Sequence, residues 1–323
     1  MLNSRKQNME RKDIEIISRH SNWTEKGIDK VLKEEVYSDS KSWKGFLNLL
    51  FISLGVGFTV SGIIFFFAYN WADLHKFAKM GLIESLIILT TIAVLFSKLN
   101  LNVKNIILTG TSVLVGVLIA VFGQIYQTGA NAYDFFLGWT LFISLWVVIS
   151  NFPPLWMVFL ILVNTTFVLY SQQVASDWSE VFVFSSLFLF NSLVLVILHL
   201  LLKFRNDIKV PSWFTSILGL AAIVFSTIGI IIGIFDNDQS SFLILLLLSI
   251  VAYGAGLIYS FRTKSGFYLS IIPFSIIVII SSLLIKISED AAMFFIVSIF
   301  IIASVTLLIK GLLDIQKKWN NGK

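Results

Sequence analysis

The chain contains no cysteine, and this absence excludes disulfide bonds, thiolate nucleophiles, iron–sulfur clusters and cysteine-ligated zinc together. Histidine is nearly absent too. The distribution of basic residues predicts a membrane topology in which His20 lies in a cytoplasmic segment, His75 at an outer helix start and His199 near an inner helix end. The three histidines therefore cannot share one metal ion. No Gly-x-Ser-x-Gly elbow, His-Glu-x-x-His helix or phosphate-binding loop occurs in the sequence. We therefore expect no catalytic residues, no metal site and no cofactor.

Charge is scarce as well, since Asp, Glu, Lys and Arg together make up only 13% of the 323 residues, whereas 57% are hydrophobic. A globule of this size cannot be solvated by so little polar surface, so the composition predicts an integral membrane protein in a lipid bilayer. The net charge of +5 does not indicate a nucleic-acid partner, because the basic residues are spread over short loops and a mixed-charge N-terminus. The first 40 residues contain no apolar core region, so we expect no cleaved signal peptide.

Long apolar runs are what the sequence does have. A hydrocarbon core of about 30 Å is crossed by a helix of roughly 20 apolar residues, and ten runs approach or reach that length. The sequence therefore predicts an all-α fold, a polytopic transmembrane bundle of about ten spans. The turn at 151–154 is compatible with either a loop or a re-entrant bend. The ten predicted spans are 45–69, 74–96, 105–126, 134–150, 154–170, 180–202, 213–235, 241–261, 267–285 and 291–309.

The basic residues orient these spans. Of the 24 Lys and Arg residues, 21 fall on one side of the ten-span arrangement, and only Lys76, Lys79 and Lys286 fall on the other. Cytoplasmic loops carry the excess of Lys and Arg, so both termini are predicted to be cytoplasmic and the protein to lie in the inner (plasma) membrane. Acidic residues without neighbouring bases occupy several of the opposite loops, in agreement with this orientation.

Four regions follow from this topology. Residues 1–44 are predicted to form a small cytoplasmic helical hairpin, with helices over 13–18 and about 24–36 and with Asn22 and Glu25 as a capping pair. Its apolar residues are too few for an independent core, so we expect it to dock on the membrane surface or on a partner protein. A four-span core over 45–152, a six-span region over 153–311 and a cytoplasmic tail over 312–323 complete the predicted organisation.

Two polar motifs end neighbouring spans on the non-cytoplasmic face. If the first and third spans pack side by side, as glycines at 55, 57, 62, 110, 116 and 123 would favour, one amide from each span reaches the same depth. The alternative is a tight helical hairpin with an interfacial tryptophan and a capping aspartate. The candidate ligand-binding residues of the two motifs are Asn70, Trp71, Asp73, Lys76, Gln124, Tyr126 and Gln127.

Glu84 is the candidate proton-coupling residue, because it is the acidic residue that the prediction places well inside a span. Gln124 or Asn164 is its expected partner. The alternative places Glu84 near the interface, beside Lys79 or Lys76. Asn164, Asn191 and the Gly-x-x-x-Gly motif at 229–233 are more typical of helix–helix contacts, so the last six spans are interpreted as scaffold.

The segments just described resemble a family of bacterial predicted membrane proteins, domain-of-unknown-function family 2157. The family pattern has a short helical head with Trp and Gly, a first span ending in Ala-x-Asn-Trp, and a third span ending in Gly-Gln-x-Tyr before a Trp in the fourth. The resemblance covers about the first 150 residues and implies the topology without implying an activity. The matching residues here are Trp23, Gly27, Ala68, Asn70, Trp71, Gly123, Gln124, Tyr126 and Trp139.

Two functions remain open at this point. The two polar span ends on one face favour a solute-handling protein, a transporter or a sensor, with a polar pocket that opens outward and binds a small solute. The undersized apolar hairpin favours a membrane scaffold or assembly subunit, which would bind a membrane-protein partner through the hairpin and through small-residue helix faces.

Overall fold

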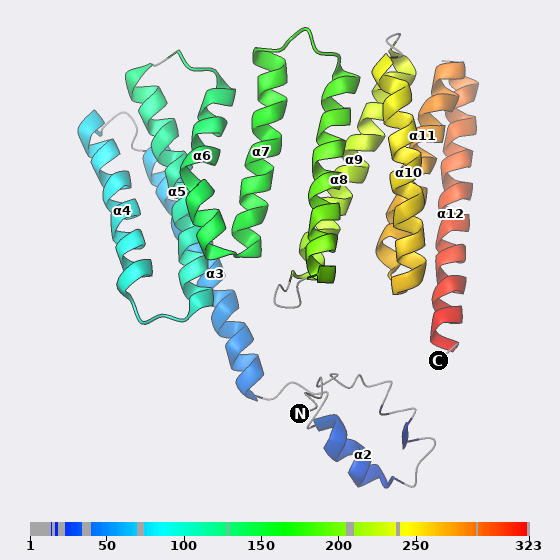
Figure 1. Ribbon diagram of the computed structural model, residues 1–323, viewed down its shortest axis with the longest axis horizontal. Helices are drawn as coiled ribbons and strands as arrows, with labels where there is room; N and C mark the ends of the chain where they lie inside the picture. Colours follow the sequence, from blue (N-terminus) through cyan, green and yellow to red (C-terminus); the bar gives the residue numbers. More distant parts are fainter. Residues whose placement is uncertain are drawn as a thin grey trace. The chain divides into compact units, whose positions relative to one another are not determined.

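The computed structural model describes residues 14, 17–18, 23–33, 40–69, 74–127, 129–204, 210–236, 240–288 and 290–321. The described residues form eleven helices and no strand (Figure 1). Ten of these helices are long and apolar enough to cross a membrane. The chain is therefore an all-helical, multi-pass membrane protein, as the sequence predicts.

The helix bounds agree with the predicted spans to within a few residues at most ends. The largest difference is at the last helix, which continues twelve residues beyond the predicted end at residue 309. The ten long helices are α3 (Ser40–Tyr69), α4 (Lys76–Phe96), α5 (Leu101–Tyr126), α6 (Ala132–Ser150), α7 (Pro153–Gln173), α8 (Glu180–Phe204), α9 (Ser212–Phe235), α10 (Ser240–Thr263), α11 (Gly266–Ile287) and α12 (Ala291–Asn321).

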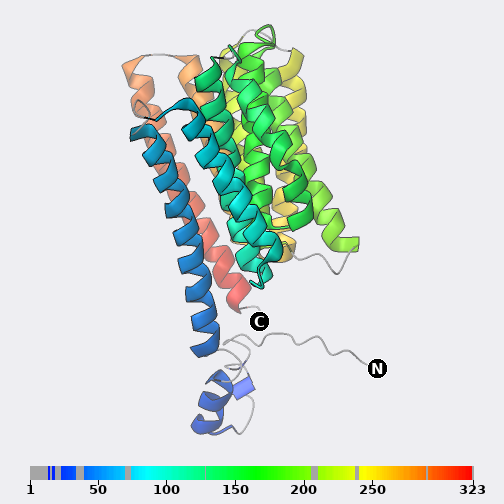
Figure 2. The ribbon, with the colours of Figure 1, turned by 90° about the vertical axis from the view of Figure 1, so that its left-hand side faces the viewer.

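The chain divides into an N-terminal unit, residues 1–126, and a C-terminal unit, residues 127–323. In the N-terminal unit α3, α4 and α5 share a small apolar cluster of Phe67, Ile83 and Val121. The first and third spans do touch, because a Cβ on Gly110 of α5 would lie 2.5 Å from Cγ1 of Val56 on α3. Figure 2 shows these helices running alongside one another.

The other glycines expected at this contact behave differently. A Cβ on Gly55, Gly57, Gly62 or Gly123 would meet nothing within 4 Å. The expectation that these four glycines bring α3 and α5 together is therefore wrong. At Gly110 the missing side chain removes the steric barrier to the close approach of α3.

The N-terminal head, which the sequence predicts to be cytoplasmic, is described in part. Ile14, Ile17 and Ser18 are helical, and a second helix, α2, spans Glu25–Val31. The N-cap of α2 is Thr24, whose hydroxyl accepts a hydrogen bond from the Gly27 amide at 3.3 Å. The predicted capping pair of Asn22 and Glu25 was therefore placed two residues too early, and Asn22 itself lies outside the described residues.

The turn between α6 and α7 is a short loop between two spans. Asn151 ends α6 in the left-handed conformation, with φ of 45°, and its amide donates to the Val147 carbonyl at 3.3 Å. Asparagine tolerates this conformation better than most residues, and Pro153 begins α7 because a helix start needs no amide donor there. The chain thus reverses within two residues, and the re-entrant alternative does not apply.

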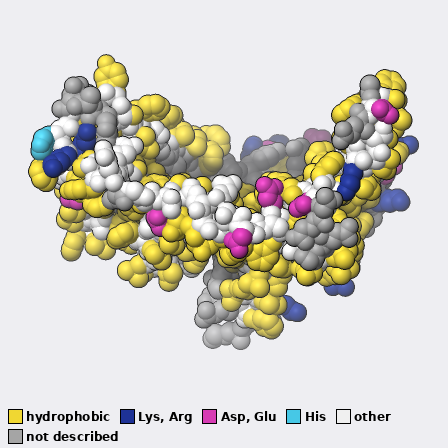
Figure 3. All heavy atoms as spheres, turned by 90° about the horizontal axis from the view of Figure 1, so that it is seen from above, with side chains coloured by type: hydrophobic (Ala, Val, Ile, Leu, Met, Phe, Trp, Pro, Cys, Tyr) yellow, Lys and Arg dark blue, Asp and Glu magenta, His cyan; other side chains and the backbone are white. Residues whose placement is uncertain are grey.

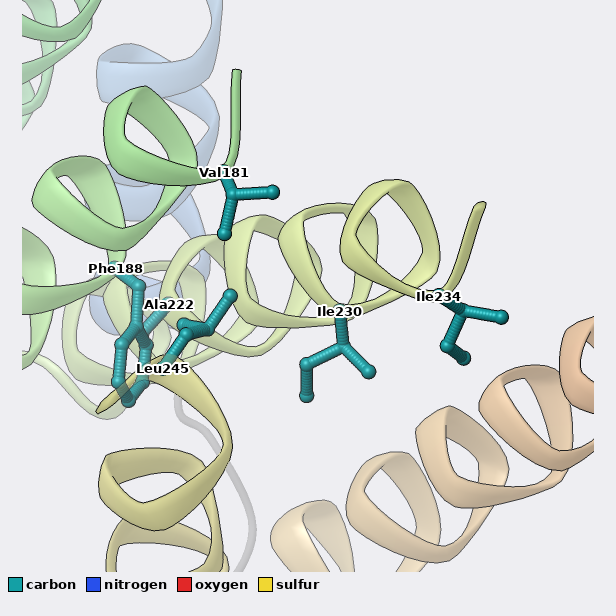
Figure 4. Packing of buried hydrophobic residues seen from close by; sticks show 6 residues of the cluster. All are labelled: Val181, Phe188, Ala222, Ile230, Ile234 and Leu245. Carbon is teal, nitrogen blue, oxygen red and sulfur yellow. The ribbon is translucent and has the colours of Figure 1, made fainter. Parts of the chain in front are cut away.

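The core of the C-terminal unit surrounds α9, the helix most buried in this unit. Side chains of α8, α9 and α10 form an apolar cluster there, which includes Val181, Phe188, Ala222, Ile230 and Leu245 (Figure 4). Gly229 and Gly233 lie at close approaches, as the Gly-x-x-x-Gly motif predicts. A Cβ on Gly229 would meet Leu245 and Phe184, and one on Gly233 would collide with the ring of Phe242.

We predict that Gly229→Ala lowers the stability of the protein by about 1–3 kcal/mol, the usual cost of overpacking a filled core. The new Cβ would lie 3.0 Å from the Cβ of Phe184, which cannot move without its helix. Gly254→Ala on α10 is the matched control, because its Cβ meets nothing within 4 Å. Thermal unfolding in one detergent measures both variants. Equal melting temperatures for the two variants would show that the contact at Gly229 is not tight.

Candidate functional site

The structure places only part of the predicted outer-face site. Asn70, Trp71 and Asp73 lie outside the described residues. Lys76 is exposed at the start of α4 with its ammonium 5.3 Å from the ring centroid of Phe77. The other predicted residues lie at the end of α5, where Gln124, Tyr126 and Gln127 are exposed.

The four described motif residues are not joined to one another. Tyr126 packs its ring 4.7 Å from that of Phe122 on its own helix, and Gln127 leaves α5 in the left-handed conformation. No hydrogen bond links any two of Lys76, Gln124, Tyr126 and Gln127 in the structure. Their role as a ligand site therefore stays a prediction.

Glu84 lies inside α4, eight residues after the helix begins at Lys76, and so about 12 Å along its axis. Its side chain is exposed on the surface of the N-terminal unit, next to the fully buried Ile83. Asn164, one of its two expected partners, instead hydrogen-bonds to Asn191 in the other unit. Proton coupling by Glu84 likewise stays a prediction.

Asn164 on α7 and Asn191 on α8 form a reciprocal amide pair. Nδ2 of Asn191 donates to Oδ1 of Asn164 at 2.8 Å, and Nδ2 of Asn164 donates back at 3.3 Å. Asn191 is only 1% exposed. The sequence interpretation of these two residues as links between helices is confirmed, because their side-chain amides join α7 to α8.

A network of five hydroxyl groups joins α9, α10 and α11 in the middle of their length. Ser226 and Ser249 are 2.6 Å apart, Thr227 and Ser275 are 2.6 Å apart, and the Tyr253 hydroxyl lies 2.8 Å from Ser275. Thr227 also donates to a carbonyl one turn earlier on its own helix. Each of the five hydroxyl groups thus has a hydrogen-bond partner, and no charged group takes part. We therefore interpret the network as a structural contact that holds the three helices together.

The C-terminal unit has a cavity of about 460 Å³ at the ends of α7, α8 and α9 that lie on the predicted non-cytoplasmic side. We call it the outer cavity. Its polar lining comes from the end of α7, the following turn and the start of α8, and its floor from Phe184 and Ile232. The polar lining residues are Ser171, Gln172, Ser176, Trp178 and Glu180.

Aromatic rings brace one wall of the outer cavity. Trp178 packs edge-to-face against Tyr170 at 5.8 Å and against Phe182 at 5.2 Å, and its ring lies 5.9 Å from that of Phe167. Tyr170 in turn packs against Tyr133 of α6 at 5.4 Å. These contacts hold the indole in place while it stays 36% exposed, so a face or edge of the ring is available to a ligand.

The described charged residues at this end of the C-terminal unit are mostly acidic, and one of them, Glu180, lines the outer cavity. Figure 3 looks onto this end of the helices, where acidic side chains are visible between hydrophobic flanks. The described basic residue at this end of the unit, Lys286, donates its ammonium to the carbonyl of Ile234. Such an environment favours a cation over an anion. The described acidic residues at this end are Asp134, Asp177, Glu180, Asp236 and Asp290.

The sequence interpretation missed this cavity, because it assigned the second half of the chain to scaffold. The available signal was the segment 170–180, in which a tyrosine, two glutamines, a tryptophan and two acids surround a span end. Taken singly, the acids are typical of an outer loop and the aromatic residues of a membrane interface, so no one of them indicates a binding site. Their convergence depends on the close packing of α8 against α9, which places Ile232 beneath the polar turn.

Comparison with protein families finds that residues 25–156 match a family described as predicted membrane protein (DUF2157). The match includes α2, α3, α4, α5 and α6 and ends just inside α7. The resemblance stated from the residues is therefore confirmed over this part of the chain. No curated protein and no solved structure matches the sequence significantly.

Proposed function

We propose that this multi-pass membrane protein, whose residues 25–156 match the predicted membrane protein family DUF2157, binds a small organic cation at its non-cytoplasmic face and acts as a solute sensor or transporter. It lies in the inner membrane with both termini in the cytoplasm. The outer cavity is the observation that carries this proposal.

The chemistry of the outer cavity supports a cationic solute. Glu180 supplies a carboxylate, Trp178 supplies an aromatic face, and Gln172 with two serines supplies hydrogen-bonding groups. A cation over an indole gains about 0.5–2 kcal/mol, and a nearby carboxylate adds direct attraction. Glu180 is also the first residue of α8, where a carboxylate stabilises the helix start.

The orientation can be tested directly because the chain has no native cysteine. We predict that Asp177→Cys, in the turn before α8, reacts with a membrane-impermeant maleimide in intact spheroplasts. Leu99→Cys, in the turn between α4 and α5, is expected to react only after the membrane is opened. The opposite pattern would reverse the topology and place the outer cavity in the cytoplasm.

We predict that choline binds the purified protein in calorimetry at least about tenfold more tightly than its neutral carbon analogue 3,3-dimethylbutanol, which corresponds to about 1.4 kcal/mol. Glu180→Gln is expected to remove this preference by removing the charge. Asp177→Asn is the matched control, since it removes one charge from the same turn without changing the cavity lining, and it is expected to weaken choline binding less than Glu180→Gln does. Equal binding of the two compounds, or unchanged binding by Glu180→Gln, would contradict the cation site.

The same calorimetry separates this cavity from the motif residues. Gln124→Ala and Glu84→Gln leave the outer cavity intact, so choline binding is expected to persist in both variants. A loss of binding confined to these two variants would move the solute site to the N-terminal unit.

A scaffold role is the second candidate function, and the head supplies the observation that favours it. Ile17 and Trp23 are 39% and 40% exposed, so the head presents apolar side chains that its own helices do not cover. If the head binds a protein partner, deletion of residues 1–39 should remove a stoichiometric partner from the detergent-purified protein while insertion into the membrane persists. A truncated protein that retains the same partner would eliminate the role of the head.

A further inference from the structure

A second cavity of the C-terminal unit, with a volume of about 480 Å³, lies between α8, α9, α10 and α11 toward their opposite ends. We call it the inner cavity. We propose that it binds one anionic phospholipid from the cytoplasmic leaflet, with an acyl chain in the cavity and the phosphate beside Lys203. This site does not depend on the outer cavity or on its solute.

The inner cavity is long and apolar. Its lining along α8 extends from Phe188 to Lys203, which is about 22 Å of helix axis. A single leaflet of a bilayer core about 30 Å thick is roughly 15 Å deep, so the cavity is long enough for the part of an acyl chain that lies in one leaflet. Small residues on the facing helices, including Ala222, Ala252 and Gly256, leave the space open.

Rigid packing forms the walls of the inner cavity. A Cβ on Gly219 would collide with Tyr268, so the glycine allows the tyrosine ring to lie against α9, and the Tyr268 hydroxyl donates to the Thr215 carbonyl at 3.4 Å. At the deep end lies Tyr253, which the hydroxyl network holds through Ser275. Neither wall can relax easily into the space, because both rings are fixed by packing or hydrogen bonds.

The cavity opens sideways, toward the lipid. Val196 and Leu200 line it from α8 and are 56% and 49% exposed, and Tyr259 lines it from α10 and is 40% exposed. Exposed apolar side chains on a membrane span face acyl chains. A phospholipid could therefore insert one chain from the bilayer without leaving its leaflet.

Charge at the inner end selects the headgroup. Lys203 lies in the last turn of α8 and lines the cavity, and His199 lies one turn earlier with its ring 5.1 Å from that of Tyr259. Arg262 lies in the last turn of α10, at the same end. No acidic residue is among the described residues that line the cavity. Basic pockets between spans on the cytoplasmic side are suited to anionic lipid headgroups.

Native mass spectrometry of the delipidated full-length protein tests the proposal. We expect one phosphatidylglycerol molecule to be retained about fivefold or more in preference to phosphatidylcholine with the same chains. Lys203→Gln should remove this preference, since one lysine near an anionic headgroup accounts for about a fivefold difference. Lys310→Gln, an exposed charge on α12 that does not line the cavity, should leave the preference unchanged.

A second pair of variants tests the acyl-chain position. Ala255 is exposed and lines the cavity, so Ala255→Phe should fill the mouth and lower retention of both lipids at least fivefold. Val251→Phe, one turn away on the same exposed face of α10, should retain both. If Ala255→Phe does not fold, the Lys203→Gln comparison decides alone. Equal retention of the two phospholipids by the wild type, non-saturable binding, or retention of palmitate in place of phosphatidylglycerol would each overturn the assignment.

Discussion

The hydrocarbon layer offers no hydrogen-bond partner, and the internal structure of this protein depends on how its polar side chains meet that constraint. Most serines and threonines in the spans donate to a carbonyl three or four residues earlier, as Thr140, Ser185 and Ser281 do. This bond satisfies the hydroxyl inside its own helix and leaves the helix surface apolar. Only a few polar groups therefore remain to join one helix to another.

Those few groups determine which helices hold together. Thr111 on α5 donates to the Thr90 hydroxyl of α4 at 3.0 Å, and two asparagines join α7 to α8. The hydroxyl network joins α9 to α10 and α11. Hydrogen bonds of this kind contribute about 0.6 kcal/mol each in membranes, so close packing at glycines supplies the rest. Neither contribution alone determines the arrangement of the helices.

The same packing separates the two cavities. Both lie along α8 and α9, and Ile230 and Leu245 of the apolar cluster lie at the level between them. Phe188 belongs to this cluster and also lines the inner cavity. If the outer cavity binds a solute as we propose, that solute is therefore separated from the inner cavity in this arrangement.

The sequence predicts the spans well because length and apolarity are local properties. The bounds of α3 to α11 follow from runs of apolar residues, and the turn at Asn151 follows from Asn and Pro chemistry. Contacts between helices are less predictable, since a Cβ on Gly55, Gly57, Gly62 or Gly123 would meet open space, whereas one on Gly110 would meet Val56 of the neighbouring helix. A glycine in the sequence shows that a close helix contact is possible there, but whether a neighbouring helix approaches at that position depends on the tertiary packing.

The candidate sites were the least predictable part, for a related reason. Glu180, Trp178 and Lys203 each have an ordinary explanation in sequence: an acid at a helix start, an interfacial aromatic, and a base in a cytoplasmic loop. What the sequence does contain is the asymmetry of charge across the bilayer. Under the predicted orientation, the excess of bases lies on the side of Lys203, which lines the inner cavity, whereas acids without neighbouring bases lie on the side of Glu180, which lines the outer cavity. The two ends of α8 thus carry side chains of opposite charge, and this difference is the basis on which we propose a cationic solute at one end and an anionic lipid at the other.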